Sequence, residues 1–152
     1  MNDNQDCVAY AGHLQAEHRH LHHRLRDLQV ELNNVNVDRI DGPMLQRMIE
    51  GGQQLTDELT SHFAEEQAGG CMDYAVSRVP ALGAEVTSLE AEHPVLLRDL
   101  NSMLTQLRNA RAGELGFAEI KQQFDAFVVR LLSHEARESR VVERGFNMPL
   151  DE

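Results

Sequence analysis

Apolar residues recur every three or four positions along four separate stretches of this chain. The first stretch carries Leu14, Leu21, Leu25, Leu28 and Leu32. Such spacing places one apolar face along a helix. We therefore predict an all-α fold with helices over about residues 10–32, 43–67, 80–112 and 117–145. Alternating steps of three and four are typical of helices packed at about 20°, so an antiparallel up-down four-helix bundle is expected.

Proline and glycine mark the ends of these predicted helices. Pro43 and Pro80 each stand where a helix is expected to begin, a position that proline favours. The glycine pair at 69–70 ends the second helix. The residues that follow, including Cys71 and Tyr74, are expected to form a loop.

Six polar residues occupy positions on these apolar faces where the pattern calls for an apolar side chain. They are His18, His62, Glu66, His93, His134 and Glu138. Four of them form two His-x-x-x-Glu pairs, whose members project from one side of a helix about one turn apart. Buried imidazoles and carboxylates are costly unless something pairs with them. Six such residues on four helices therefore predict a bound metal, and more specifically a pair of metal ions.

The chain also has the pattern of an internal duplication. The triplet ending in His18 recurs as the triplet ending in His93, Ala-Glu-His in both cases. From these histidines to the His-x-x-x-Glu pairs the separations are 44 and 41 residues. Two similar hairpins would place two metal-binding halves face to face. Glu17 and Glu92, at equivalent places, are candidates for orienting the ligands. Glu65 and Glu135 also neighbour ligands, but surface positions are expected for both.

Composition and charge narrow the class of protein. The chain of 152 residues is predicted to form one domain over residues 1–152. Its formal net charge of −11 argues against nucleic acid or an anionic membrane as a partner, because either requires a basic face. The polar N-terminal residues give no sign of a signal peptide, and no apolar run reaches the ~20 residues of a membrane span. A cytoplasmic location is expected, with Cys7 and Cys71 as free thiols.

Four short stretches together resemble the hemerythrin-like family, the HHE cation-binding domains. They are Glu17-His18, His62-Phe63-Ala64-Glu65-Glu66, Glu92-His93 and His134-Glu135-Ala136-Arg137-Glu138. The resemblance covers about residues 10–146. The di-iron bundles of the ferritin-like class use Glu-x-x-His instead, so the order and spacing here favour the hemerythrin-like class.

The resemblance implies a di-iron centre in the bundle. Glu66 and Glu138 would bridge two non-haem irons, with an oxo or hydroxo group as a further bridge. The four histidines would be terminal ligands. Another divalent metal, such as zinc or manganese, could occupy the same residues. An open position on one iron would take O₂, peroxide or another small ligand.

The chain departs from the oxygen-carrying hemerythrins at two places. Those proteins have a second histidine one turn after the ligand of the third helix, where this chain has Leu97. Their pair on the fourth helix has one more intervening residue and an Asp, whereas this chain has His134 and Glu138. The ligand set is more similar to that of the iron- and oxygen-responsive members. His22, one turn after His18, is an additional candidate ligand.

The leading functional prediction is a non-haem di-iron protein that binds or senses O₂, peroxide or nitric oxide, or that handles iron. Its partner would be a small diatomic ligand or peroxide. An enzyme on the same site, a peroxidase or oxidase, is the alternative, and no catalytic residue is assigned. A metal-free helical signalling module with a phospho-accepting histidine is the third hypothesis. The sequence contains no nucleophile elbow, P-loop, dinucleotide fingerprint or HExxH motif. It leaves the metal and the oligomeric state open.

Overall fold

The structure is a computed structural model that describes residues 3–34, 42–109 and 117–148. These residues are almost entirely helical. The elements are α1 (Asp3–Asn34), α2 (Gly42–Gly69), α3 (Cys71–Arg78), the 3₁₀ turn η2 (Pro80–Leu82), α4 (Gly83–Asn109) and α5 (Phe117–Phe146). The all-helical prediction is confirmed. None of the helices in the described residues contains an apolar stretch that could span a membrane.

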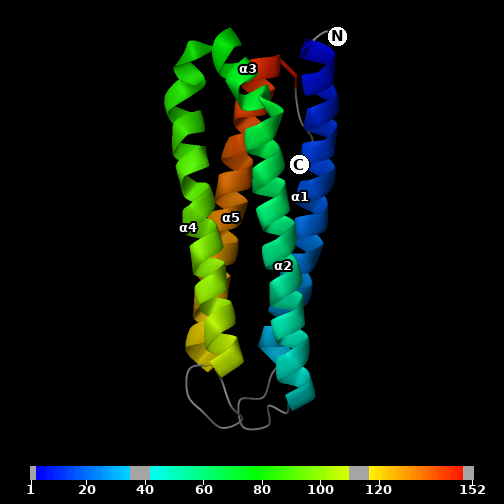
Figure 1. Ribbon diagram of the computed structural model, residues 1–152, viewed down its shortest axis with the longest axis vertical. Helices are drawn as coiled ribbons and strands as arrows, with labels where there is room; N and C mark the ends of the chain where they lie inside the picture. Colours follow the sequence, from blue (N-terminus) through cyan, green and yellow to red (C-terminus); the bar gives the residue numbers. More distant parts are fainter. Residues whose placement is uncertain (1–2, 35–41, 110–116, 149–152) are drawn as a thin grey trace.

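The long helices α1, α2, α4 and α5 lie side by side along most of their length (Figure 1). Helix α1 contacts α2 and α5, and α4 contacts the same two helices. The short helix α3 packs mainly on α5, at the end of the molecule where α1 begins. Each long helix therefore turns one side toward the space that the other three enclose, and the apolar faces predicted from the sequence fill this space.

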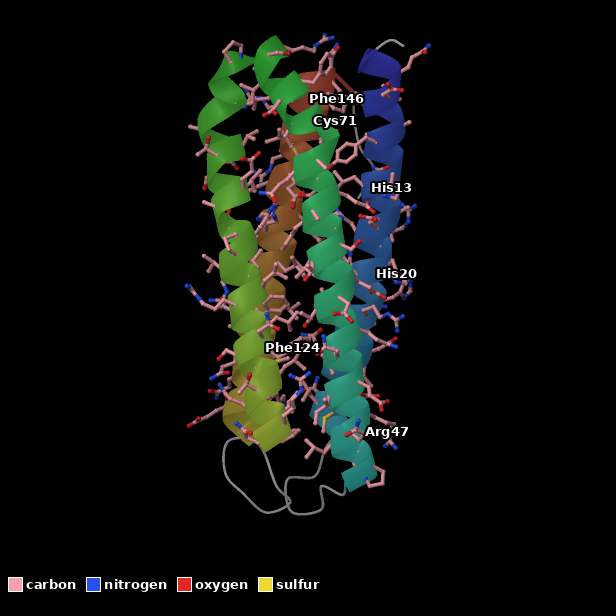
Figure 2. The ribbon with its side chains drawn as sticks, viewed as in Figure 1. His13, His20, Arg47, Cys71, Phe124 and Phe146 are labelled. Atoms are coloured by element: carbon pink, nitrogen blue, oxygen red, sulfur yellow. The ribbon has the colours of Figure 1, made fainter. Side chains whose placement is uncertain are left out.

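The buried side chains form two apolar clusters rather than one continuous core. One cluster surrounds Leu55, Leu100 and Phe124, and the other surrounds Leu14, Cys71 and Phe146. Figure 2 shows Cys71 and Phe146 near one end of the helices and Phe124 toward the other. Along α1, α4 and α5, the candidate ligands stand between residues of one cluster and residues of the other, as His18 does between Leu14 and Leu21. A polar layer thus divides the apolar core.

The prediction of a loop after the second helix is wrong. Cys71 begins helix α3, which ends at Arg78 and is followed by the turn η2. Gly70 has φ 70°, a left-handed conformation that glycine adopts at little cost, and it ends α2 and lets the chain change direction. Three residues of α3 then become buried: Cys71, Met72 and Ala75. This face is too short to stand out as a helical period in the sequence.

The other boundaries differ less from the prediction. Helix α1 begins at Asp3 and not near residue 10, and α4 begins at Gly83, after Pro80 has started the 3₁₀ turn. The predicted end of the third helix, near residue 112, lies outside the described residues. The prediction of a single domain stays a prediction.

Candidate metal centre

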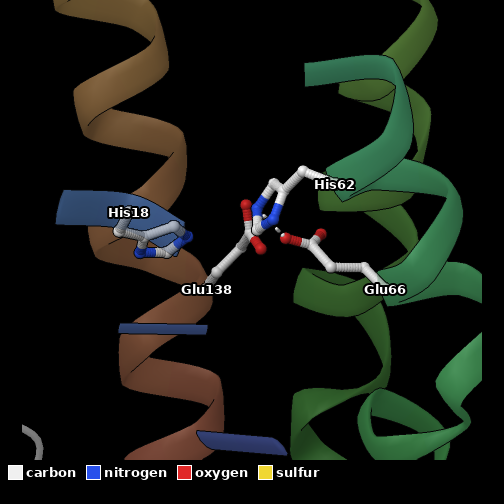
Figure 3. Close-up of side chains that lie close together, drawn as sticks. All are labelled: His18, His62, Glu66 and Glu138. Carbon is white, nitrogen blue, oxygen red and sulfur yellow. Dashed lines mark ion pairs between the residues drawn. The ribbon is translucent and has the colours of Figure 1, made fainter. Parts of the chain in front are cut away.

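The six candidate ligands come from all four long helices. Helix α1 supplies His18, α2 supplies His62 and Glu66, α4 supplies His93, and α5 supplies His134 and Glu138. All six are buried, with exposed fractions between 0% and 5%. Figure 3 shows four of them pointing toward one another, His18 from α1, His62 and Glu66 from α2, and Glu138 from α5. The structure therefore brings together the side chains that the sequence singled out.

Among the described residues, these side chains form two overlapping groups. The first is His18, His62, Glu66 and Glu138, and the second is Glu66, His93, His134 and Glu138. Within each group, one nitrogen or oxygen atom per residue lies within 4.8 Å of the others. Each group has two imidazoles of its own, and both groups share the two carboxylates. This is the arrangement that two metal ions bridged by carboxylates require.

The nitrogen and oxygen atoms of the candidate ligands are in close contact but are poorly arranged for hydrogen bonds. His62 Nε2 lies 2.5 Å from Glu66 Oε1, and His134 Nε2 lies 2.6 Å from Glu138 Oε1. His93 Nε2 lies 3.3 Å from Glu66 Oε2. Despite these short distances, each of the six residues has at least one buried nitrogen or oxygen that makes no hydrogen bond within the described part of the chain.

These unpaired atoms test whether the site fits a metal. They include the Nε2 atoms of all four histidines and both carboxylate oxygens of Glu138. Buried polar atoms normally have partners, and each one without a partner costs roughly 1–3 kcal/mol. A cation placed between them would satisfy several at once. The donor set of imidazole nitrogen and carboxylate oxygen, without thiolate, fits iron and other borderline divalent metals.

Two glutamates outside the groups contact the far side of the ligand rings. Glu17 accepts a hydrogen bond from His62 Nδ1, so that Nε2 is the nitrogen directed into the site. Glu92 Oε2 lies 3.6 Å from His134 Nδ1 and accepts a 2.6 Å hydrogen bond from Arg137 Nη1. The glutamates of the duplicated Ala-Glu-His triplets thus each lie toward a histidine of the next long helix, but only Glu17 is within hydrogen-bond distance of its histidine. An orienting role for both glutamates stays a prediction.

Aromatic packing fixes the imidazoles and keeps water away from one side. The ring of Phe63 stacks on that of His93, with centroids 4.0 Å apart and an angle of 8° between the planes. The same ring meets His134 edge to face at 5.6 Å. Phe63 directly follows His62 on α2. Its ring therefore contacts one candidate ligand of α4 and one of α5.

Burial keeps two of the histidines neutral. It lowers the pKa of His18 to about 3, and it lowers the pKa of His134 to about 4 with a further contribution from His93. A neutral imidazole is the form that binds a metal. At neutral pH these two rings need lose no proton before ligation.

The remaining ionisable groups share protons. Burial disfavours a charge on His62, but contact with Glu66 and Glu17 outweighs burial and raises its pKa to about 9. Burial also opposes the charge on Glu66, yet contacts with Glu138, His62 and His93 hold the pKa of Glu66 well below its usual range. Burial and the charge of Glu66 raise the pKa of Glu138. Without a metal, protons on His62 and Glu138 are therefore favoured.

His22, the additional candidate, lies outside both groups. Its Nε2 atom is 2.5 Å from Glu135 Oε2. The expectation of a surface position is wrong for Glu135, which is 3% exposed, and burial raises its pKa. Its neighbour on the sequence, His134, lies on the same broad buried face of α5. By contrast, Glu65 is exposed and pairs with His13 at 3.0 Å.

Three cavities of the described residues adjoin the site. The first lies between α1 and α5, has a volume of about 140 Å³ and is lined by residues that include His18, His22 and Glu135. The second lies between α1 and α2, has a volume of about 310 Å³ and is lined by residues that include Glu17 and His62. The third is much smaller, about 10 Å³, and is lined by residues that include Glu66, Met72, His93 and Glu138. A small molecule in the α1–α5 cavity would reach the His18 side of the site.

Sequence reasoning missed Tyr10. Its hydroxyl is buried and makes no hydrogen bond within the described residues. Burial, followed by the charges of Glu66 and Glu138, raises the pKa of this phenol far above its usual value. Tyr10 lies eight residues before His18 and four before Leu14, on the same face of α1, so the helical period itself could have identified it.

The comparisons with known proteins agree with this geometry. The family model described as "Hemerythrin HHE cation binding domain" matches residues 11–144, which include all six candidate ligands. No curated protein and no solved structure matches the chain. Since the family model covers most of the sequence, the chain belongs to the hemerythrin HHE cation-binding domain family.

Proposed function

We propose that this chain is a di-iron protein with the up-down four-helix arrangement of the hemerythrin-like fold, and that it binds or senses a small oxidant. In this proposal His18 and His62 hold one iron, His93 and His134 hold the other, and Glu66 and Glu138 bridge them. The observation that carries the proposal is the sharing of both buried carboxylates by both groups of ligands. A single-metal site would need only one group.

Iron is proposed because of the donor set and the family. Imidazole nitrogen together with carboxylate oxygen suits iron, and neither group contains a thiol of Cys7 or Cys71. When bound, iron with an open coordination position supplies a site at which O₂, peroxide or nitric oxide can bind and exchange electrons with the metal.

The residues around the ligands prepare the site for this use. Glu17 holds His62 in the tautomer that presents Nε2, and Phe63 shields His93 and His134 from water. The protons on His62 and Glu138 must leave before these residues can ligate. The α1–α5 cavity, at about 140 Å³, is large enough for a diatomic molecule or peroxide and borders His18.

A peroxidase or oxidase is the second candidate, and the same cavity favours it. Its volume exceeds the roughly 30 Å³ that one water molecule occupies in the liquid, so a co-substrate has room beside the oxidant. Polar side chains, Gln15, Arg19 and His22, line it as well. A phospho-accepting histidine is less compatible with the site, because the six candidate ligands are buried and a phosphoryl donor could not reach them.

Exposure of the iron-loaded protein to oxidants distinguishes these functions. Anaerobic diferrous protein would be mixed in turn with O₂, hydrogen peroxide and nitric oxide while its absorbance is recorded. If the protein binds or senses these molecules, each should change the absorbance only until one equivalent per di-iron site has been added. An enzyme predicts continued consumption of peroxide when a reductant is supplied in excess. No spectral change with any of the three would refute both functions.

A further inference from the structure

Cys7 and Cys71 face each other across the end of the molecule where α1 and α3 meet. Their Sγ atoms are 2.6 Å apart, although 64 positions separate them in the sequence. Both side chains are 5% exposed and lie in the apolar cluster that contains Ala11, Ala75 and Phe146. The expectation from sequence was two unrelated free thiols, because the spacing forms no recognised motif.

The fold brings these sulfurs together through one local feature. Gly70, with φ 70°, ends α2 and starts α3, so that Cys71 points back to the first turns of α1. Helix α3 is then held on α5 by a very close approach, since a Cβ on Gly145 would come within 2.3 Å of Ala75 Cβ. With α3 fixed on this side, Cys71 has little freedom to move away from Cys7.

We propose that Cys7 and Cys71 are a redox pair that forms an intramolecular disulfide and so fastens α3 to α1. A disulfide needs sulfur atoms about 2.05 Å apart, so a shift of roughly half an ångström joins these two. The proposal does not depend on a bound metal or on the proposed function.

The oxidant is a hydroperoxide, and hydrogen peroxide is the simplest of this class. One thiolate attacks a peroxide oxygen, the O–O bond breaks, and a sulfenic acid and water result after proton transfer. The other sulfur then attacks the sulfenic sulfur, the S–S bond forms, and a second water leaves. In total the two thiols lose two protons and two electrons, and one peroxide takes them up and becomes two waters.

Burial makes the reduced pair persistent. It raises the pKa of Cys71 to about 12, and contact with the Cys7 sulfur adds to the effect. At neutral pH Cys71 is therefore a neutral thiol. Because the thiolate is the reactive form, this thiol reacts slowly. A small oxidant is needed because both sulfurs are buried. Once formed, the disulfide would be similarly protected from large reductants.

The disulfide would fix an element that borders the metal site. Met72, next to Cys71, lines the small cavity together with Glu66, His93 and Glu138. Tyr10 lies one turn after Cys7 on α1, and the charges of Glu66 and Glu138 contribute to its raised pKa. Oxidation of the pair would therefore hold both of these neighbours in place.

The test uses the full chain, purified under reductant and stripped of metal with a chelator. After removal of the reductant, it is treated with hydrogen peroxide at a few equivalents and then denatured in an alkylating agent. Free thiols are counted by intact mass, cross-linked peptides are mapped, and non-reducing denaturing electrophoresis separates single chains from linked ones. Cys7→Ala and Cys71→Ala serve as matched controls, since each retains one of the two thiols.

We expect the reduced chain to take two alkyl groups and the oxidised single chain to take none. A Cys7–Cys71 peptide should appear, a dithiol reductant should restore both thiols, and the melting temperature should rise by several degrees on oxidation. Each single variant should instead yield linked dimers, over-oxidised cysteine or an unreacted thiol. Two alkylated cysteines after peroxide, or sulfinic acid at each cysteine without a link in the wild-type chain, would overturn the proposal. Since the wild-type result alone decides it, a variant that fails to fold does not obscure the outcome.

Discussion

Glu66 of α2 and Glu138 of α5 meet inside the molecule, where both belong to both groups of candidate ligands. Two ionised carboxylates could not share so dry a site, and the pKa values move apart accordingly, with Glu66 held ionised and Glu138 raised by burial and by the charge of Glu66. A proton on Glu138 therefore removes a repulsion that a bound cation would also remove. Protons and metal ions compete for this site.

Glu138→Gln should abolish most metal binding while leaving the metal-free protein folded. Glutamine resembles the protonated carboxyl that the metal-free site contains, so the metal-free melting temperature should change little. It cannot bridge two cations as a carboxylate does, and because Glu138 belongs to both groups, both ions should be affected. Metal content and melting temperature would be measured in parallel. His20→Ala is the matched control, because His20 is outside both groups and pairs with Glu58 at 3.2 Å. Equal metal content in Glu138→Gln and wild type would contradict the assignment.

Glu17→Gln should weaken metal binding without removing it. Glu17 accepts the hydrogen bond that fixes the His62 tautomer, and loss of such a partner typically lowers affinity roughly 10- to 100-fold. Competition with a chromogenic chelator would measure the change. Glu92→Gln should have a smaller effect, since its contact with His134 is 3.6 Å long. Glu65→Gln, at an exposed neighbour of His13, should bind metal as wild type does. The reverse order of effects would show that Glu17 has no orienting role.

The metal-free protein should lose stability as the pH rises from 6.5 to 9. His62 releases its proton near 6.5 in the unfolded chain and near 9 in the folded one, so the folded state binds more protons in this window and its stability falls as these are removed. A difference of about 2.5 pH units corresponds to at most roughly 3 kcal/mol. Protonated Glu138 acts in the same direction. Urea unfolding of chelator-treated protein at both pH values would measure the loss, and His62→Gln should show less of it. Identical losses in the two proteins would exclude His62 as the source.

Gly145→Ala should destabilise the protein far more than Gly52→Ala. An added Cβ at Gly145 meets the backbone of Ala75, with the Cα atom at 2.8 Å, so α3 itself must move. We expect a cost of about 1–3 kcal/mol or more. At Gly52 the added Cβ meets the end of the Leu104 side chain, which can rotate, and the better helix propensity of alanine offsets part of the strain. Thermal unfolding of both variants checks the order. Equal costs would mean that α3 is not held closely against α5.

The sequence was most informative where one local rule was broken repeatedly. His18, His62, His93 and His134 stand at helical positions that should be apolar, and the 3.6-residue period is a local property that a single sequence displays. The same reasoning identified Glu66 and Glu138 and, through the repeated triplet, Glu17 and Glu92. Their convergence followed from the packing of four apolar faces.

The features that were missed depend on contacts between distant segments. Helix α3 is positioned by the turn at Gly70 and by the close approach of Ala75 to Gly145. Eight residues are too few for a helical period to reveal either feature. Glu135 is buried by α1, whose His22 pairs with it, although its neighbours in sequence indicate a surface position. The contact between Cys7 and Cys71 likewise requires the position of α3 to be known first.

The most direct test of the central claim is the number of metal ions that the chain retains. The purified protein would be loaded anaerobically with excess ferrous iron, desalted, and assayed for iron per chain, with an absorbance spectrum before and after exposure to air. The shared carboxylates predict about two irons per chain and a charge-transfer band of a bridged diferric pair after oxidation. One iron per chain, or none, would contradict a centre in which Glu66 and Glu138 serve two ions at once.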